Sequence, residues 1–326
     1  MANKKVLFIG IGFYDYEQSI IDEFKAQDYD VDYFSEVPDS TFAYKFYSRR
    51  NNIKKLETIR AKHSNDIVVR SSANYDLVFI IKCEYLTMAS LEVLKAKNPK
   101  ARFVLYLWDS LTRFKAIEDK FVFFDTIYSF DRFDCENNNR LIFHPLFYRN
   151  EYLSSGTDNK EFDYGLYHLG WYHSDRLKLI KKVVSQLKDN GVSYKVVLFT
   201  GYLSYFMDTL FGGQLKGNKE YLIFKPISAR ENFGKILRSK VVLDIAHPDQ
   251  SGLTMRTIEM IGAEKKLITT NRDVVNYDFY RPENIIILDR YNPVIDAGFF
   301  ENAYSSIPED LKNKYSIRSW LKTMIK

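Results

Sequence analysis

Short apolar runs alternate with amphipathic stretches through the first half of the chain. The run at 77–81 is continuously apolar, which is typical of a strand buried on both faces of a sheet. A helical pattern follows it and ends at Asn98-Pro99, because proline disfavours helical backbone in the residue before it. The strands predicted in this half are 6–10, 31–34, 77–81, 102–107 and 126–130. Apolar strands separated by helices predict a parallel sheet that is covered on both faces.

A polar stretch that contains Ser154-Ser155-Gly156 follows, and it predicts a linker at 149–161. The alternation of strands and helices then restarts. Ser228 and Glu231 have the spacing of a capping box, which marks the start of a helix. The strands predicted in this half are 164–169, 195–199, 241–245 and 267–269, and the helices are 175–187, 228–238 and 254–263.

The whole pattern predicts an α/β fold with two Rossmann-like domains that face each other across a cleft. The first domain is expected at 1–148 and the second at 162–310, with the linker between them. The segment 311–326 is expected to contain a short amphipathic helix. Whether this helix packs back on the first domain stays open.

Composition restricts the class of protein. The chain has 326 residues, enough for about two domains, and its 46% hydrophobic and 27% charged residues are typical of a globular protein. Two cysteines are too few for a disulfide framework or a four-cysteine zinc site. No apolar run approaches the ~20 residues of a membrane-spanning helix, and the N-terminus leads straight into a strand rather than a signal peptide. We therefore expect a cytoplasmic protein.

Two motifs that often bind cofactors are present only in part. Gly10-Ile11-Gly12 follows the first predicted strand, as in a dinucleotide-binding fingerprint, but Asp15 replaces the third glycine. We therefore expect a tight strand-to-helix turn rather than a nicotinamide site. Asp28-x-Asp30 and Asp30-x-Asp32 match the Asp-x-Asp motif of metal-dependent nucleotide-sugar enzymes, but both lie where a helix runs into a strand. An acidic turn at a helix end is the better explanation, and no metal site is predicted.

The segment 244–271 carries the clearest signal for a binding site. A predicted buried strand ends in a polar loop with Ser251-Gly252, and a helix begins directly after it. Free backbone N–H groups and the helix dipole at such a start favour an anion, and Gly252 would let a phosphate approach the backbone. Arg256 could meet the phosphate charge and Glu259 could accept ribose hydroxyls. The alternative is an ordinary capped helix with a surface Arg–Glu pair.

Two further loops of the second domain are expected at the same edge of its sheet. The stretch from Gly170 to Arg176 closes a strand and opens a helix, and Lys225-Pro-Ile227 precedes the predicted capping box. Open α/β sheets bind ligands at the carboxyl ends of their strands, so this convergence favours a nucleotide site. The predicted donor-binding residues are Gly170, Tyr172, Arg176, Lys225, Ile227, His247, Ser251, Gly252, Leu253, Thr254, Arg256, Thr257 and Glu259.

The stretch Ser251-Gly-Leu-Thr-Met-Arg-Thr-Ile-Glu259, continued by Lys265–Asn271, resembles the donor-site signature of bacterial capsule, exopolysaccharide and lipopolysaccharide glycosyltransferases of the GT-B fold. Weaker likenesses at 106–110, 124–131, 144–147 and 172–176 extend the resemblance over most of the chain except 35–70. Glu259 is similar to the second Glu of the Glu-x7-Glu pattern, which binds the ribose of the nucleotide sugar. With seven residues between the two Glu, the first would stand at position 251, which is Ser251 and is followed by Gly252, so the first Glu is absent and the stereochemical class stays open.

The resemblance implies a donor site on the C-terminal domain and an acceptor site on the N-terminal domain. It also implies no resident cofactor and no metal, with the nucleotide sugar as co-substrate. Arg176, Arg256 and the N–H groups after Ser251 would stabilise the departing diphosphate. An inverting reaction needs a base, for which Asp109 is the first candidate and Asp15 and Glu84 are the fallbacks. A nucleotide-sugar epimerase of the same architecture and a non-catalytic nucleotide-binding subunit are the alternatives.

The segment 41–70 has several aromatic residues and then a basic run. This order suits a helix that contacts anionic lipid headgroups, at the inner face of the cytoplasmic membrane if the acceptor is lipid-linked. A basic helix whose aromatics pack on the first domain is the alternative. No stacking platform accompanies the charge, so nucleic acid is not an expected partner. The expected partners are a nucleoside-diphosphate sugar and a glycan or lipid-linked acceptor.

Overall fold

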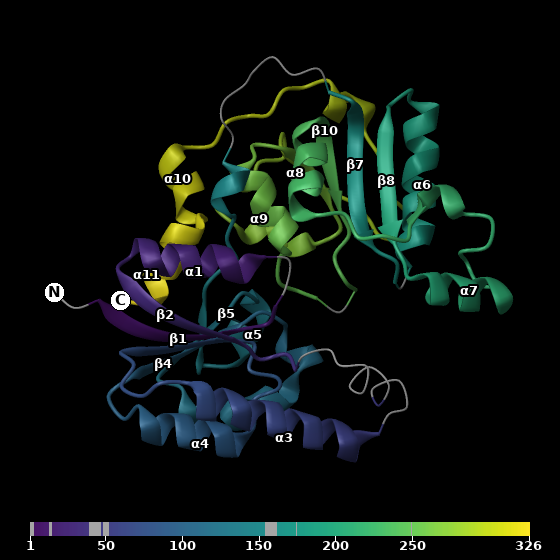
Figure 1. The fold of residues 1–326 in the computed structure, drawn as a ribbon. Helices are drawn as coiled ribbons and strands as arrows, with labels where there is room; N and C mark the ends of the chain where they lie inside the picture. The colour runs from purple at the N-terminus through teal and green to yellow at the C-terminus, as the bar shows by residue number, and fades with distance from the viewer. Residues whose placement is uncertain are drawn as a thin grey trace. The chain divides into compact units, whose positions relative to one another are not determined.

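The computed structural model describes residues 3–12, 15–38, 47, 52–153, 162–173, 175–248 and 250–326. The chain divides into two compact units. Unit 1 comprises Met1–Leu146 together with Ile317–Lys326, and unit 2 comprises Phe147–Ser316. Each unit is an α/β structure with one parallel six-stranded sheet, as the alternation of strands and helices predicts (Figure 1).

The sheet of unit 1 has the strand order β2-β1-β3-β4-β5-β6, and all neighbours are parallel. The strands are β1 (Lys4–Gly10), β2 (Tyr29–Ser35), β3 (Leu77–Ile81), β4 (Arg102–Leu107), β5 (Thr126–Ser129) and β6 (Leu141–Phe143). The helices are α1 (Tyr16–Ala26), α3 (Ile53–Arg70), α4 (Met88–Lys97) and α5 (Arg132–Asn137). The five predicted strands are confirmed, and β6 is an addition that the sequence pattern did not reveal.

Helices cover both faces of this sheet because alternate residues of each strand point to opposite faces. On one face, Val78 and Ile80 of β3 share a core with residues of α3 and α4. On the other face, the Phe79 ring lies 5.7 Å from Phe24 of α1 and 6.0 Å from Trp320 of α11 (Ile317–Met324).

Helix α11 therefore belongs to unit 1, although it is the last helix of the chain. The Trp320 ring lies 5.0 Å from Tyr106, and the Trp320 carbonyl is 3.1 Å from Nε2 of His144. Helix α10 (Glu309–Lys314) lies in unit 2, so the segment expected at 311–326 divides at Ser316. The expected linker also differs at its start, since Tyr152 is buried within unit 2, whereas 154–161 lie outside the described residues.

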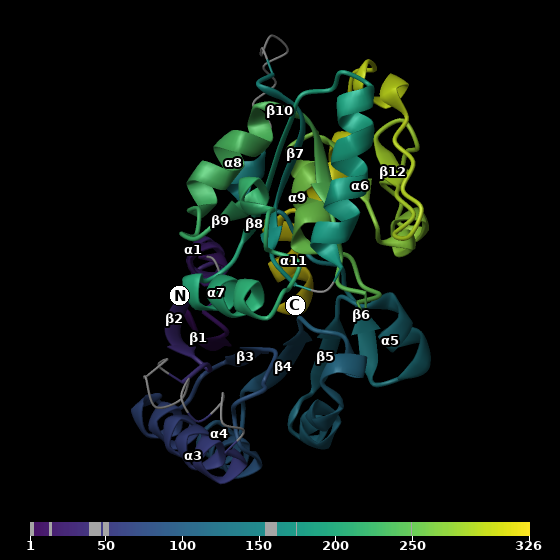
Figure 2. The ribbon, with the colours of Figure 1, turned by 90° about the vertical axis from the view of Figure 1, so that its right-hand side faces the viewer.

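The sheet of unit 2 has the order β12-β11-β10-β7-β8-β9 and is also parallel (Figure 2). Its strands are β7 (Tyr164–Trp171), β8 (Tyr194–Phe199), β9 (Leu222–Ile223), β10 (Ser239–Asp244), β11 (Lys266–Thr269) and β12 (Ile285–Ile287). Its other helices are α6 (Arg176–Asp189), α7 (Tyr202–Leu210), α8 (Ala229–Leu237) and α9 (Met255–Gly262). The predicted strands and helices are confirmed, and α7, β9 and β12 are additions.

The strand order places a topological switch point between β7 and β10. From β7 the chain continues outward to β8 and β9, and from β10 it continues in the opposite direction to β11 and β12. The loops that leave the carboxyl ends of two such strands diverge, and the crevice between them is where open α/β sheets bind ligands. β7 ends at Gly170-Trp171 and β10 ends at Asp244, and the two predicted donor stretches 170–176 and 244–271 begin at these strand ends. No helix in the described part of the chain is long and apolar enough to cross a membrane.

Candidate functional site

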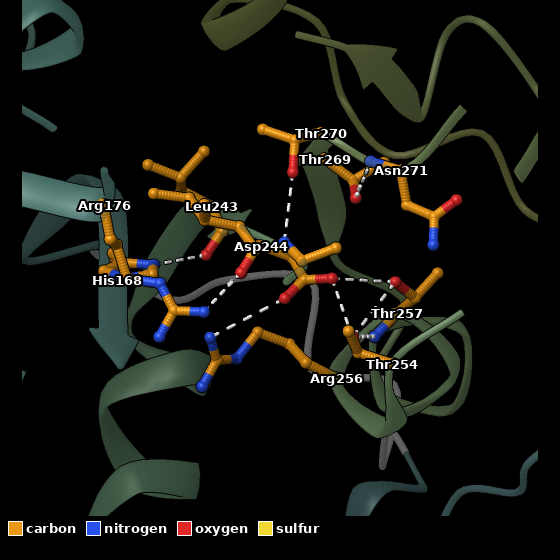
Figure 3. A network of polar contacts seen from close by, with 12 residues as sticks. His168, Arg176, Leu243, Asp244, Thr254, Arg256, Thr257, Thr269, Thr270 and Asn271 are labelled. Atoms are coloured by element: carbon orange, nitrogen blue, oxygen red, sulfur yellow. Dashed lines mark hydrogen bonds and ion pairs between the residues drawn. The ribbon is translucent and has the colours of Figure 1, made fainter. Parts of the chain in front are cut away.

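Asp244 ties the end of β10 to the start of α9. Its Oδ2 accepts hydrogen bonds from Oγ1 of Thr254 at 2.7 Å and from Oγ1 of Thr257 at 3.0 Å (Figure 3). Thr254 is the N-cap of α9, and its Oγ1 also accepts the N–H of Thr257 at 3.3 Å. An N-cap of this kind satisfies one of the free N–H groups of the first turn. The network fixes the N-terminus of α9 at the switch point of the sheet.

Asn271 holds the loop that precedes α9. Its Nδ2 donates to the carbonyls of Ser251 at 3.0 Å and of Gly252 at 2.9 Å. Gln250 donates to the same Gly252 carbonyl at 3.0 Å. The loop is therefore held in one conformation by side-chain amides. Gly252 itself is buried, whereas the prediction that a phosphate approaches its backbone assumes that the residue is accessible.

Two arginines lie where the two central loops meet. Arg176 is buried and donates to the carbonyls of Trp171 at 2.8 Å and Ile245 at 2.6 Å, so it bridges the loops after β7 and β10. Nη1 of Arg256 lies 3.8 Å from Oδ1 of Asp244, and its side chain is 23% exposed. Burial, and next the positive charge of Arg256, lower the pKa of Arg176 to about 10.

His168 lies beside Arg176, and the charges of both arginines act on its ring (Figure 3). Its Nδ1 is 2.8 Å from the carbonyl of Leu243, and its buried Nε2 has no hydrogen-bond partner among the described residues. Burial lowers the pKa of His168 well below its usual value, and the charges of Arg256 and Arg176 lower it further. The imidazole is therefore neutral. A Cβ at Gly170 would lie 2.9 Å from both His168 Nε2 and Arg176 Nη1, so this position requires glycine.

A third arginine, Arg290, lies beside the two central loops, and nothing in its local sequence marks it as part of the site. Arg290 forms a bidentate ion pair with Asp175, with both N···O distances 2.8 Å, and it also donates to the carbonyl of Ala246 at 3.0 Å. The hydrogen bonds from Arg290 are the main reason that the pKa of Asp175 is lowered. The three guanidinium groups and the carboxylates of Asp175 and Asp244 form what we call the arginine cluster. Its one excess positive charge, beside a helix N-terminus, suits an anionic ligand.

Glu259 lies deeper than the sequence suggests. Its side chain is 6% exposed, and Oε1 lies 3.9 Å from Nε of the buried Arg149. The carboxylate also contributes, after burial, to raising the pKa of Tyr152. The alternative of a surface pair between Arg256 and Glu259 is therefore wrong. Arg149 follows the predicted first domain directly, and nothing in its local sequence marks it as a partner of Glu259.

The structure brings only some of the remaining predicted donor-binding residues to the central strands β7 and β10. The Tyr172 hydroxyl is 3.2 Å from Oδ2 of Asp208, and the His247 ring lies 5.3 Å from the His173 ring. Leu253 is buried and apolar, so only its backbone could contact a polar ligand. Lys225 and Ile227 follow β9, which is two strands away from β7.

The predicted capping box after Lys225 forms only in part. Ser228 accepts the N–H of Glu231 at 3.2 Å, which starts α8 as expected. The Glu231 carboxylate, however, pairs with Lys235 at 2.6 Å.

In unit 1, the two acids Asp109 and Glu84 share one lysine. Nζ of Lys82 lies 2.9 Å from each carboxylate, and Arg113 also lies 3.1 Å from Asp109. Lys82 and the next residue have positive φ angles of 74° and 59°, which are strained for non-glycine residues. Strain of this kind persists where surrounding contacts enforce it, and here it directs Lys82 between the acids. Asp109 must release a cation before it can act as a base.

Beneath this group lies Glu36, a residue that the sequence analysis did not consider. It is fully buried, and its Oε1 accepts the N–H of Glu84 at 2.9 Å. Burial raises the pKa of Glu36 to about 8. The side chain therefore keeps its proton at neutral pH.

Asp15, the other fallback base, is an exposed residue with a φ angle of 61° just before α1. Close by, the buried carboxylate of Glu17 accepts the N–H of Ile11 at 3.1 Å. The turn after β1 thus already holds an anionic side chain where a dinucleotide would place its pyrophosphate. Phe13 and Tyr14 of this turn lie outside the described residues.

Asp28 and Asp32 of the Asp-x-Asp stretch lie in different local environments. Asp28 lies in the turn after α1 with a φ angle of 63°, and Asp32 accepts a hydrogen bond from the Tyr75 hydroxyl. The described part of the chain contains no group of three or more His, Cys, Asp or Glu side chains that could hold a metal ion.

The predicted basic segment is described only from Asn52 onward, apart from Tyr47. Asn52 caps α3 by accepting the N–H of Lys55 at 3.2 Å. Within α3 the basic side chains of Lys54, Lys55 and Lys62 are exposed, whereas Ile67 and Val68 are buried in unit 1. The aromatic and basic residues of this prediction that lie outside the described residues are Phe42, Tyr44, Phe46, Arg49 and Arg50.

No family model and no curated protein sequence matches the chain. Solved structures do match it over almost its whole length. HepE of Anabaena, in complex with UDP and glucose, has a TM-score of 0.60 at 11% identity and covers 99% of this chain and 98% of its own. The lipopolysaccharide outer core galactosyltransferase WaaB, in its apo form, has a TM-score of 0.50 at 12% identity, with 98% and 99% covered.

A UDP-GlcNAc 2-epimerase from Methanocaldococcus jannaschii, in complex with UDP-GlcNAc and UDP, has a TM-score of 0.51 at 12% identity, with 99% and 93% covered. Likeness at such low identity establishes the fold. The chain has the GT-B type of architecture, with two Rossmann-like units.

Proposed function

We propose that this protein is a glycosyltransferase that moves a sugar from a nucleotide-sugar donor to a glycan or lipid-linked acceptor in the synthesis of a bacterial surface polysaccharide. The observation that carries the proposal is the arginine cluster beside the N-terminus of α9, at the switch point of unit 2. Glycosyl transfer releases a nucleoside diphosphate. Fixed cations and helix N–H groups stabilise the negative charge that develops on that leaving group.

Within this proposal the described residues have separate roles. Arg256 is the most exposed of the three arginines of the cluster, so it is assigned to the diphosphate. Arg176 and Arg290 hold the loops through backbone carbonyls and add to the positive potential. Asp244 and Asn271 keep the start of α9 and its loop in place. HepE binds UDP in its crystal, which makes UDP-sugars the first donors to test.

The acceptor side is assigned to unit 1, at the carboxyl end of β3 and β4. Asp109 and Glu84 are the candidate bases, and Lys82 links them. An acceptor hydroxyl that displaces Lys82 from one carboxylate would free that carboxylate to take the proton. If the reaction retains configuration, no base is required here. The function also places the protein in the cytoplasm, in peripheral contact with the membrane where the acceptor is lipid-linked.

An epimerase of the same architecture is the second candidate, because a UDP-GlcNAc 2-epimerase matches the fold with a TM-score of 0.51. The experiment that separates the candidates is a binding screen of UDP, GDP, CDP and dTDP, followed by incubation with the matching sugar nucleotides. Transfer to an acceptor extract supports the glycosyltransferase, and interconversion of the sugar supports the epimerase. Binding without turnover would indicate a nucleotide-binding subunit instead.

Replacing Glu259 with glutamine is expected to weaken binding of the matched nucleoside diphosphate about ten- to a hundredfold, because a ribose would lose charged hydrogen bonds of roughly 1.5–3 kcal/mol. Titration calorimetry of the folded variant measures this change. Arg149→Gln is the matched control, because it breaks the same ion pair and leaves Glu259 in place. If Glu259 only anchors Arg149, both variants will lower the melting temperature and neither will weaken nucleotide binding.

Transfer activity is expected to persist in EDTA, because the arginine cluster provides the positive charge that a metal would otherwise bring to the diphosphate. The rate is compared before and after exhaustive dialysis against EDTA, and then after addition of Mn²⁺ or Mg²⁺. Activity that disappears in EDTA and returns with manganese would contradict the metal-free mechanism.

A further inference from the structure

Helix α7 of unit 2 turns its apolar residues outward. The helix begins at the carboxyl end of β8, and the next residue after it is Phe211. Leu210 and Phe211 are 63% and 76% exposed, values that are typical of lysine rather than of leucine or phenylalanine. What we call the α7 apolar face consists of Tyr202, Leu203, Phe206, Met207, Leu210 and Phe211, all of them at least 43% exposed.

The opposite side of α7 shows that this orientation is fixed by specific contacts. The Tyr205 ring lies 5.2 Å from Phe224 in an edge-on arrangement. Asp208 accepts the N–H of Leu215 at 2.7 Å and lies 3.2 Å from the Tyr172 hydroxyl. The only acidic side chain of the helix is thus turned inward, and rotating α7 to bury its apolar face would break these hydrogen bonds. The contacts on the inner side of α7 therefore keep its apolar face exposed.

Exposed residues at a neighbouring strand end and directly after α7 are of the types found at lipid–water interfaces. Trp171, at the end of β7, is 51% exposed and its ring lies 4.5 Å from Phe199 of β8. Aromatic side chains of this kind favour the headgroup region of a bilayer. Exposed Lys216 and Lys219 follow the helix, with Glu220 as the exposed acid of that stretch. The stretch that directly follows the α7 apolar face therefore carries one excess positive charge.

We infer that the α7 apolar face docks unit 2 onto an anionic lipid bilayer, with its aromatic and aliphatic side chains in the headgroup–acyl boundary and its lysines at the phosphates. A helix of nine residues is about 14 Å long, and α7 together with Phe211 presents six side chains. A stable protein–protein interface needs about 20–30 residues from each partner, so this face is too small to hold a second copy alone. An interfacial helix, by contrast, acts as a single element that buries 5–10 Å deep.

The location of the face agrees with a membrane-bound acceptor. Helix α7 and the arginine cluster both follow the carboxyl ends of strands in the same sheet, since β8 is the neighbour of β7. Docking through α7 would therefore bring the donor-binding edge of unit 2 toward the lipid surface. The docking itself does not depend on the catalytic proposal, and its test does not use activity.

The test is co-sedimentation of the full chain with vesicles of phosphatidylcholine alone and with 30% phosphatidylglycerol. The native protein is expected to bind the anionic vesicles. The triple variant Phe206→Ser, Leu210→Ser, Phe211→Ser is expected to partition at least about tenfold more weakly, because it removes three large apolar side chains whose transfer from water into the bilayer is favourable. Lys216→Gln with Lys219→Gln should weaken binding about fivefold per lysine and reduce its salt dependence.

Tyr291→Ser with Val294→Ser is the matched control, because both residues belong to unit 2 and are 74% and 75% exposed. This variant should bind vesicles like the native protein. Equal vesicle binding by the triple variant and the native protein, or failure of the native protein to bind, would overturn the inference. So would loss of binding in Lys54→Gln with Lys55→Gln on α3 while the triple variant still binds. Light scattering tests the other occupant. If the native protein is a dimer and only the triple variant is a monomer, the face binds a second copy instead.

Discussion

Replacing Arg256 with glutamine is expected to lower the turnover of the matched nucleotide sugar by about 10²–10³-fold in a protein that remains folded. Removing one preorganised group that stabilises developing negative charge typically costs that much in rate. Asp244 would keep its hydrogen bonds from Thr254 and Thr257, so the start of α9 stays in place. Arg256→Lys should fall between the two, because lysine keeps the charge but not the planar fork of donors.

The measurement is kcat at saturating donor, with nucleotide affinity determined separately. Arg272→Gln is the control, because Arg272 is an arginine of the same unit with a side chain 79% exposed, paired with Asp289. That variant makes the same change in net charge and should turn over at the native rate. Equal turnover of the Arg256 and Arg272 variants would remove Arg256 from the leaving-group site.

Replacing Glu36 with glutamine is expected to abolish a strong pH dependence in the stability of unit 1. An exposed glutamate ionises near 4.5, whereas burial raises the pKa of Glu36 to about 8. Between these pH values the native state holds a proton that the unfolded chain has released. Stability therefore falls as pH rises from about 4.5 to about 8 and levels off above that. The full difference amounts to on the order of 5 kcal/mol, because each pKa unit corresponds to about 1.4 kcal/mol.

Three charged groups face Glu36 and modulate this effect. Lys120 and Lys82 favour its ionised form, and Glu84 opposes it, whereas burial is the largest influence. Glutamine keeps an oxygen that can accept the N–H of Glu84, so the local hydrogen bond can survive. The native protein contains three tryptophans, of which Trp108 and Trp320 lie in unit 1. In a Trp171→Phe background, fluorescence therefore reports the unfolding of unit 1 alone.

The experiment compares urea unfolding of the Glu36→Gln variant and its parent at pH 5 and pH 8. Burial lowers the pKa values of His168 and His144, so both residues lower the stability of the native state as pH falls below about 6.5. This pH dependence is opposite to that of Glu36. Their contributions cancel in the difference between variant and parent. Glu57→Gln is the control, because Glu57 is an exposed carboxylate on α3. Parallel stability curves for Glu36→Gln and its parent would show that Glu36 ionises normally.

Local sequence was enough to predict the central strands and the helix starts. Strand β3 is a continuous apolar run, and β10 has an apolar centre at 241–243, as burial on both faces of a parallel sheet requires. Thr254 and Ser228 cap α9 and α8 through side chains that lie within three residues of their acceptor N–H groups. Strands β6, β9 and β12 have two or three residues each, too few for any periodicity to be visible.

The main contacts of the site join residues that are far apart in the sequence. Arg290 meets Asp175 across 115 positions of sequence, and Arg149 meets Glu259 from a stretch expected to be a linker. Glu36 acquires its buried proton only because β2 ends beside the strained turn after β3. The apolar pattern of α7 would ordinarily predict a buried helix face, yet Asp208 and Tyr205 turn it outward.

The sequence by itself therefore determined which segments form strands and helices and which strand ends carry polar loops, because those properties depend on a few neighbouring residues. The tertiary structure decided which charges pair, which carboxylate is buried with its proton and which helix face remains exposed. Each of these depends on side chains that the sheet brings together from distant parts of the chain, where burial changes both ionisation and the energy of a hydrogen bond.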